Sequence, residues 1–139
     1  MNCFKFFICK FCPMEQSQSK KILMIEDEDI FIDMFGGKLT QDGFDMTFAK
    51  NGAWGIKEAT EQNFDLIIVD MVMPAMGGEE IIDRLKLEEE TKNIPVVALS
   101  ASVDNETRER IEKIGIAAFF IKTHIVPSEL SKKIREILQ

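Results

Sequence analysis

Short apolar runs recur along the chain from residue 21 onward, and longer stretches of mixed polar and apolar character separate them. The runs are rich in Ile, Leu, Val, Met and Phe and are bounded by charged or turn-forming residues. Continuous apolar runs of this length are typical of strands that are buried on both faces of a sheet. The predicted strands cover residues 22–25, 44–49, 65–70, 95–99 and 117–121.

The stretches after each run carry apolar residues at helical spacing. In the first of them, Ile30, Met34 and Leu39 are predicted to share the buried face. Asp104 is a typical N-cap residue, and Pro127 suits the first turn of the last helix. The predicted helices cover residues 29–41, 53–62, 79–90, 104–114 and 127–138.

Five strand–helix pairs therefore follow one another with short connections. This order predicts a parallel sheet with helices on both faces, because parallel neighbours need a crossover and the crossovers are right-handed. We predict an α/β fold with a doubly wound five-stranded parallel sheet. In such sheets the functional residues lie beyond the carboxyl ends of the strands.

Polar and charged side chains end four of the predicted strands. Glu26 and Asp27 end the first, Asp70 the third, Ser100 the fourth and Lys122 the fifth. Each alone is an ordinary loop or surface residue, but all four strand ends meet at one edge of the sheet. Grouped carboxylates repel one another, and Mg²⁺, which prefers oxygen ligands, relieves that repulsion. The set predicts a Mg²⁺-dependent phosphoryl site in which Asp70 is the nucleophile and Ser100 and Lys122 bind phosphoryl oxygens.

Composition and charge exclude some classes of function. The 139 residues carry a formal net charge of −7, with 45% hydrophobic and 29% charged residues, as in an ordinary soluble domain. An acidic chain without a basic patch does not bind a nucleic-acid backbone, so no direct nucleic-acid binding is expected. We expect a cytoplasmic protein.

The first 13 residues differ from the rest, since they contain all three cysteines and four phenylalanines. They are too short to span a bilayer. Two interpretations stay open: a tail outside the fold, with the domain starting at Met14, or an interfacial anchor, which is the one route to membrane contact. Residues 1–20 are predicted to form an extension and linker, and residues 21–139 a single domain.

Across the whole body of the chain, four motifs match one family. They are ILMIEDED at 22–29, DLIIVDMVMPAMGG at 65–78, PVVALSA at 95–101 and FFIK at 119–122. With them, residues 21–139 resemble the receiver domain of two-component response regulators, of the single-domain type. The resemblance implies a flavodoxin-like (βα)5 sandwich.

The resemblance also implies roles for individual residues. Asp70 matches the phosphoacceptor, and Glu26 and Asp27 match the acidic pair that binds Mg²⁺, with Asp27 as a direct ligand. Val72 would offer its backbone carbonyl to the metal. Ser100 matches the switch hydroxyl, and Lys122 matches the lysine that closes on the phosphate with it. Phe119 matches the aromatic switch residue.

The function that the resemblance implies is signalling rather than classical enzymatic turnover. A sensor histidine kinase or phosphotransfer protein would phosphorylate Asp70, and the face built from the fourth helix, fifth strand and fifth helix would change and bind a downstream protein. The protein would be a monomer or a phosphorylation-dependent dimer. The partner and pathway are not specified by the residues.

Four features depart from the family pattern. Thr123 follows Lys122 where the family usually has proline after a cis bond, so we expect a trans bond, because a non-proline cis bond costs about 2.5–4 kcal/mol. Glu26 replaces the usual first Asp, and Ser100 the commoner Thr. Gly36 and the glycine after it interrupt the first predicted helix.

Two alternative functions fit the residues of this chain less well. A receiver-like module for docking or dimerisation would need no phosphate, but the intact set of Asp27, Asp70, Ser100 and Lys122 argues against it. An aspartyl-phosphate hydrolase of the haloacid-dehalogenase kind would need a second acid two residues after the nucleophile, where this chain has Val72.

Overall fold

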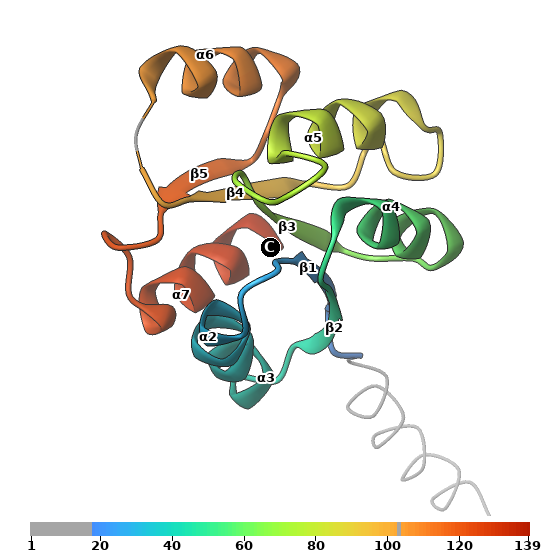
Figure 1. Cartoon of the computed structure of the whole chain (residues 1–139). Coiled ribbons are helices and arrows are strands. Elements are labelled where there is room, and N and C mark those ends of the chain that lie inside the picture. The colour runs from blue at the N-terminus through green and yellow to red at the C-terminus, as the bar shows by residue number, and fades with distance from the viewer. Residues whose placement is uncertain (1–17, 103) are drawn as a thin grey trace, which may run out of the picture.

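The computed structural model describes residues 18–102 and 104–139, and within them five parallel strands form one sheet of order β2-β1-β3-β4-β5 (Figure 1). All four neighbouring pairs are parallel, so the predicted doubly wound sheet is confirmed. The chain crosses from one side of β1 to the other between β2 and β3, which creates the reversal of strand order where such folds place their sites. The strands are β1 (Lys21–Ile25), β2 (Asp45–Ala49), β3 (Leu66–Asp70), β4 (Val96–Ser100) and β5 (Ala118–Ile121).

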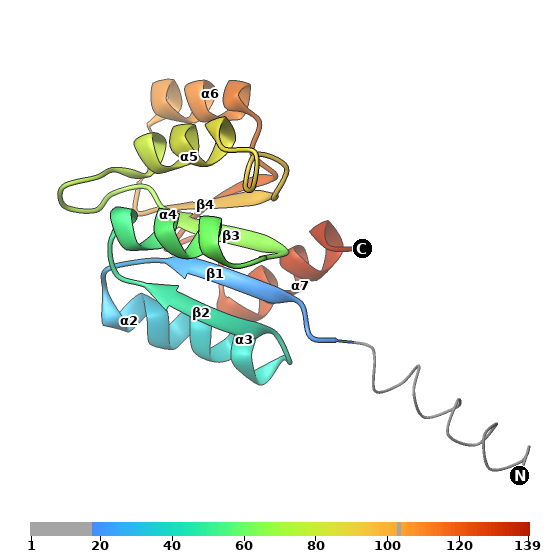
Figure 2. The same cartoon turned by 90° about the vertical axis from the view of Figure 1, so that its right-hand side faces the viewer.

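Helices cover both faces of this sheet (Figures 1 and 2). Asn51 caps α4, where its side chain accepts from the backbone N–H of Trp54 at 2.8 Å. Asp104 caps α6 as predicted, and Pro127 opens α7. The helical segments are α2 (Asp29–Phe31), the π-helical turn η1 (Ile32–Gly36), α3 (Gly37–Gln41), α4 (Gly52–Glu61), α5 (Gly78–Leu87), α6 (Asn105–Ile114) and α7 (Pro127–Ile137).

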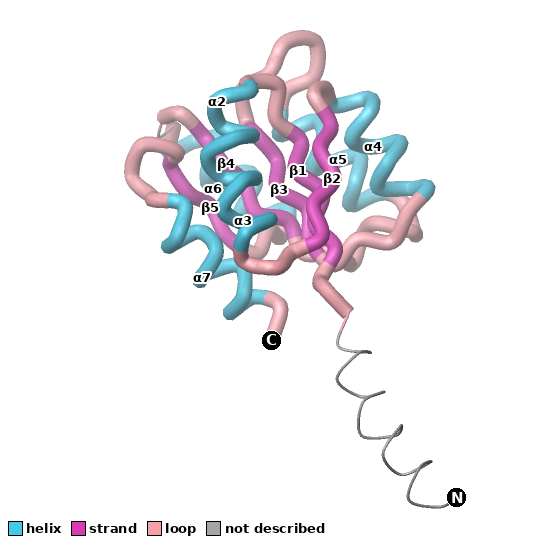
Figure 3. The backbone as a smooth tube through the Cα atoms, turned by 90° about the horizontal axis from the view of Figure 1, so that it is seen from below, coloured by secondary structure: helices cyan, strands magenta, loops and turns pink. Residues whose placement is uncertain are grey.

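The sheet separates two apolar cores. One lies under α4, α5 and α6, and the other under α2, η1, α3 and α7. Figure 3 shows the strands running side by side between these helical layers. Every residue of β3 and β4 is buried, which explains why these strands are continuous apolar runs.

Phe119 and Phe120 show how both faces of the edge strand β5 are covered. Phe119 packs against the core under α6, and Phe120 packs against the core under α7. Neighbouring residues of a strand point to opposite faces, and each face of this strand has a helix over it. Both side chains are half-buried.

The first helix differs most from its prediction. Ile30 and Met34 are exposed (67% and 39%), whereas Phe35 and Leu39 are completely buried. The helix packs close to β2, since a Cβ on Gly36 would lie only 2.4 Å from the Phe48 ring. The turn around Gly36 is π-helical, and Thr40 donates its hydroxyl to the Gly36 carbonyl at 2.8 Å. Leu39 is therefore buried as predicted, whereas Ile30 and Met34 are not and Phe35 is buried in their place.

Residues 18–20 are exposed and outside regular structure. The predictions for residues 1–13 concern residues outside the described part of the chain. Among the helices in residues 18–102 and 104–139, none combines the length and apolar character that crossing a membrane requires.

Candidate functional site

Three carboxylates meet at the carboxyl edge of the sheet. Asp70 is the last residue of β3, and Glu26 and Asp27 follow β1 directly. One oxygen from each carboxylate lies within 4.8 Å of the other two. Sheet hydrogen bonding continues past the strand ends, since Glu26 N donates to Ala49 O at 3.0 Å. The backbone of this acidic cluster (Glu26, Asp27 and Asp70) is therefore held by the sheet itself.

Lys122 lies against the acidic cluster. Its ammonium Nζ is 2.7 Å from Glu26 Oε2 and 3.2 Å from Asp70 Oδ1. All three side chains are at least 98% buried, so these ion pairs are shielded from bulk solvent. The backbone N–H of Lys122 donates to Ser100 O at 2.8 Å, which fixes the lysine at the end of β5. The Lys122–Thr123 bond is trans, as is every peptide bond in the described residues.

Backbone donors satisfy only part of the acidic cluster. Val72 N donates to Asp70 Oδ1 and Glu28 N to Glu26 Oε1, both at 3.2 Å. Among the residues that the structure describes, Glu26 Oε2 has Lys122 as its one partner. Asp27 Oδ1 and Asp70 Oδ2 are buried and have no hydrogen-bond partner within residues 18–102 and 104–139. Buried carboxylate oxygens without a donor are costly, and a hard divalent cation such as Mg²⁺ binds such oxygens, so the residues fit that ion.

Burial is the main electrostatic influence on Glu26. Burial, opposed by the Lys122 ammonium and reinforced by the neighbouring Asp70, raises the pKa of the Glu26 carboxyl from 4.5 to about 7 in all. One cation cannot neutralise several adjacent buried carboxylates. Without a second cation, the cluster therefore holds a proton at a higher pH than a free carboxyl does.

A pocket of about 350 Å³ adjoins the acidic cluster. It is lined by Val72 from the β3–α5 loop, Ser100 at the end of β4 and Phe119 of β5. The Ser100 hydroxyl is buried and donates to Ser102 O of its own loop at 2.8 Å. Phe119 lies under the guanidinium of Arg108, 5.2 Å from ring centroid to Cζ.

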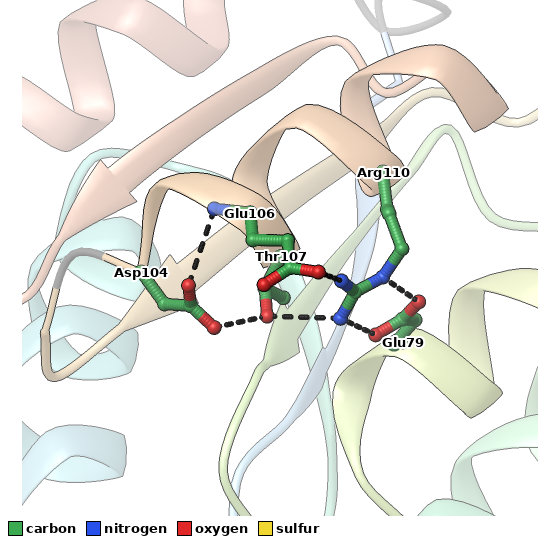
Figure 4. A network of polar contacts seen from close by, with 5 residues as sticks. All are labelled: Glu79, Asp104, Glu106, Thr107 and Arg110. Carbon is green, nitrogen blue, oxygen red and sulfur yellow. Dashed lines mark hydrogen bonds and ion pairs between the residues drawn. The ribbon is translucent and has the colours of Figure 1, made fainter.

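The outer wall of the pocket is tied together by a polar network between α5 and α6 (Figure 4). Arg110 donates to both carboxylate oxygens of Glu79, at 2.9 and 3.2 Å, and to Thr107 Oγ1 at 3.1 Å. Thr107 in turn donates to Asp104. The Arg110 guanidinium lowers the pKa of Glu79, and hydrogen bonding from Thr107 lowers the pKa of Asp104. The N-terminus of α6 is thereby connected to the first turn of α5.

The β3–α5 loop is also held close to the site. A Cβ on Gly78 would lie 2.6 Å from Met71 Cα and 2.8 Å from Asp70 O, so only glycine fits there. Gly78 N donates to Met71 O at 3.1 Å. This contact turns the chain sharply after Asp70 and leaves Val72 66% exposed at the rim.

Each residue predicted for the site lies at this edge. Glu26, Asp27, Asp70 and Lys122 are in mutual contact or within 4.8 Å, and the remaining predicted residues, Val72, Ser100 and Phe119, line the adjoining pocket. Sequence reasoning missed Phe31, whose ring lies 4.1 Å from Lys122 Nζ. The spacing of Phe31, Phe35 and Leu39, four residues apart, was the available signal for this side chain.

Comparisons with known proteins agree with this geometry. The response regulator receiver domain family matches residues 22–135 of the chain. The polar-differentiation response regulator DivK of Brucella anthropi is 30% identical over 108 residues, which cover 78% of this chain and 88% of that protein. DivK of Brucella ovis is 29% identical over 109 residues, which cover 78% and 89%.

Solved structures share the fold. Chemotaxis protein CheY4 of Vibrio cholerae has a TM-score of 0.80 at 24% identity and covers 86% of this chain and 98% of its own. The receiver domain of a sensor histidine kinase from Pseudomonas aeruginosa, with a magnesium ion coordinated in its active-site cleft, has a TM-score of 0.78 at 22% identity, with coverage of 86% and 98%. At these identities the likeness concerns the fold, and the predicted five-stranded α/β architecture is confirmed.

Proposed function

This chain belongs to the response regulator receiver domain family of two-component signal transduction, and from that premise we propose that it is a phosphorylation-driven signalling switch. The phosphoryl donor is the phosphohistidine of a sensor histidine kinase or phosphotransfer protein. The observation that carries the proposal is Asp70 Oδ2, a buried carboxylate oxygen without a partner among the described residues, beside the Lys122 ammonium. An oxygen of this kind is free to act as a nucleophile.

In the proposed transfer, an Asp70 carboxylate oxygen attacks phosphorus. The new O–P bond forms as the N–P bond to the donor histidine breaks, and the electron pair of that bond returns to the imidazole nitrogen. Lys122, which contacts Asp70 Oδ1 at 3.2 Å, balances the negative charge of the incoming phosphoryl oxygens. The chain thus acts on itself, and it is not a classical enzyme with turnover on a free substrate.

Mg²⁺ is the proposed cofactor, and Glu26, Asp27, Asp70 and the backbone carbonyl of Val72 would hold it. When bound, it would neutralise the charge that gathers on the phosphoryl oxygens. The partnerless oxygens Asp27 Oδ1 and Asp70 Oδ2 support this assignment. The magnesium-bound receiver from Pseudomonas aeruginosa, which shares the fold, supports it as well.

The proposed switch begins at Ser100. Its hydroxyl donates to Ser102 O within its own loop, and turning it toward a phosphoryl group on Asp70 would break that bond. The movement would draw the β4–α6 loop inward and open space for Phe119, which lines the same pocket. The face made by α6, β5 and α7 would change and bind a downstream protein or a second copy of the chain.

Intact mass spectrometry after incubation with acetyl phosphate and Mg²⁺ tests this function. One added phosphoryl group is expected, and it should be absent without Mg²⁺ and in the Asp70→Asn variant, which preserves shape and removes the nucleophile. If no adduct forms and beryllofluoride, a phosphoryl mimic, also fails to bind, the switch is refuted in favour of a docking module that works without phosphate.

A further inference from the structure

The ammonium of Lys122 contacts an aromatic ring as well as carboxylates. Its Nζ atom lies 4.1 Å from the centroid of Phe31, the last residue of α2. A cation at this distance from a ring face is attracted by the negative quadrupole of the ring, most strongly where water is excluded. Lys122 is only 4% exposed, so the attraction acts here with little screening.

The ring completes the surroundings of a buried ammonium. Lys122 has three N–H donors, and two carboxylates, Glu26 Oε2 at 2.7 Å and Asp70 Oδ1 at 3.2 Å, account for two of them. A third donor is left, and the face of Phe31 offers an electron-rich surface in contact with Nζ. Carboxylates and ring together define one position for the ammonium.

The helix holds the Phe31 ring firmly in that place. Phe35, one turn later, is fully buried and stacks on Phe31 with centroids 6.2 Å apart and planes at 14°. The π-helical turn that contains Phe35 packs so closely on β2 that a Cβ on Gly36 would overlap the Phe48 ring. The ring under the lysine is thus fixed by a packed segment and not by a mobile loop.

Phosphorylation would change the carboxylate contacts of Lys122 and leave the ring contact unchanged. Once Asp70 carries a phosphoryl group as an acyl phosphate, the oxygen at 3.2 Å no longer belongs to a free carboxylate, and the ammonium passes to a phosphoryl oxygen. Glu26, with the shorter contact, competes for the ammonium throughout. A ring that attracts the ammonium from a third direction limits how far Glu26 can draw it from the transferring group.

We propose that Phe31 is a positioning residue for phosphoryl transfer, in that its ring face holds the Lys122 ammonium where the phosphoryl oxygens arrive. This inference rests on the proposed function, because it assigns Phe31 a role in that reaction. It requires an electrostatic contribution from the ring in addition to its packing, and the two are separable by experiment.

Fluorinated phenylalanines introduced at position 31 alone provide the test. Added fluorines weaken the negative face of the ring with little change of shape. In full-length protein with Mg²⁺, the first-order rate of phosphorylation at saturating acetyl phosphate should fall stepwise with fluorine number, by about fivefold for the trifluorinated ring. Beryllofluoride affinity should weaken in the same order, because the ammonium is less well placed for the anion.

The same substitutions at Phe35 are the matched control, since this ring belongs to the same helix and stacks on Phe31. They should leave the rate unchanged. A flat series at position 31, or equal losses at both positions, would overturn the proposal. Absence of any phosphoryl adduct in the unsubstituted protein would instead overturn the proposed function, so the two failures are distinguishable.

Two substitutions with standard amino acids and one spectroscopic signal give a second line of evidence. Phe31→Tyr keeps the ring and should retain the rate, whereas Phe31→Leu should lose as much as the trifluorinated variant. The ε-methylene protons of Lys122 should show an upfield ring-current shift in the unphosphorylated protein that disappears in Phe31→Leu. If that shift is missing in the unsubstituted protein, the ring does not hold the lysine and the proposal is wrong.

Discussion

In buffer without divalent cations, the free energy of unfolding is expected to fall as the pH rises from about 4.5 to about 7, and Glu26→Gln should remove most of that fall. Burial raises the pKa of the Glu26 carboxyl to about 7, whereas the unfolded chain releases its proton near 4.5. Between these values the folded state binds a proton that the unfolded state has lost. Raising the pH therefore favours unfolding.

The size of the effect follows from the pKa difference. At 1.36 kcal/mol per unit, the rise to about 7 corresponds to about 3 kcal/mol. That contribution is fully present below pH 4.5, declines through the window and is absent above about pH 7. In Glu26→Gln, the neutral amide still accepts a hydrogen bond from Lys122, and position 26 carries no titrating proton.

Urea denaturation followed by circular dichroism, at about pH 5 and about pH 7.5 with a chelator present, measures the effect in both proteins. Asp42, Glu79 and Asp104 have lowered pKa values and produce the opposite slope. They are common to both proteins and cancel in the difference. Parallel stability profiles for the unsubstituted protein and Glu26→Gln would refute the reasoning.

Further predictions concern the lysine, two glycines and the α5–α6 network. Lys122→Met leaves buried carboxylates without their cation, so it should destabilise the metal-free protein by about 3 kcal/mol. Mg²⁺ should restore part of the lost stability. Equal losses with and without Mg²⁺ would contradict the proposed metal site. Gly37→Ala should stabilise the protein by about 0.5–1 kcal/mol, because nothing lies within 4 Å of the added Cβ. Gly78→Ala should destabilise it by more than about 2 kcal/mol, because its Cβ would meet Met71 Cα at 2.6 Å. Urea denaturation measures both changes, and the reverse order would contradict the packing. Arg110→Gln should lower the thermal midpoint slightly at low salt and not at high salt, because its ion pairs are exposed; a loss that persists at high salt would show that the network acts by packing.

The architecture was predictable because the sheet is buried on both faces. Buried parallel strands such as β3 must be continuously apolar, and this pattern is visible without any structure. The end of a strand is equally visible, because the first charged residue after the apolar run marks it. Asp70 and Lys122 were therefore placed correctly, and the parallel topology brought them together.

The first helix was less predictable, for a physical reason. Ile30 and Met34 have the right spacing for a buried face, but Phe31 and Phe35 have the same spacing, and in the fold Phe35 is buried and Phe31 packs against the same core. Periodicity alone does not choose between the two pairs, because both are apolar and both are helically spaced.

The contact of Phe31 with Lys122 depends on which of the two pairs faces the core, and so it was missed. The network between α5 and α6 was missed for another reason, because Glu79 and Arg110 are 31 residues apart and each is an ordinary surface charge by itself. Side-chain pairing between helices depends on their packing angle, which periodicity does not give.

The central claim is that Asp70 receives the phosphoryl group, and the most direct measurement is its chemical location. Protein treated with acetyl phosphate and Mg²⁺ is reduced with borohydride, which converts an aspartyl phosphate to homoserine, and then digested and sequenced by tandem mass spectrometry. Homoserine at position 70, lost when Mg²⁺ is omitted, is the predicted result. Homoserine at another aspartate such as Asp27, 5-hydroxynorvaline (the corresponding reduction product of a glutamyl phosphate) at Glu26, or an unmodified Asp70 in a fully folded sample would contradict the account.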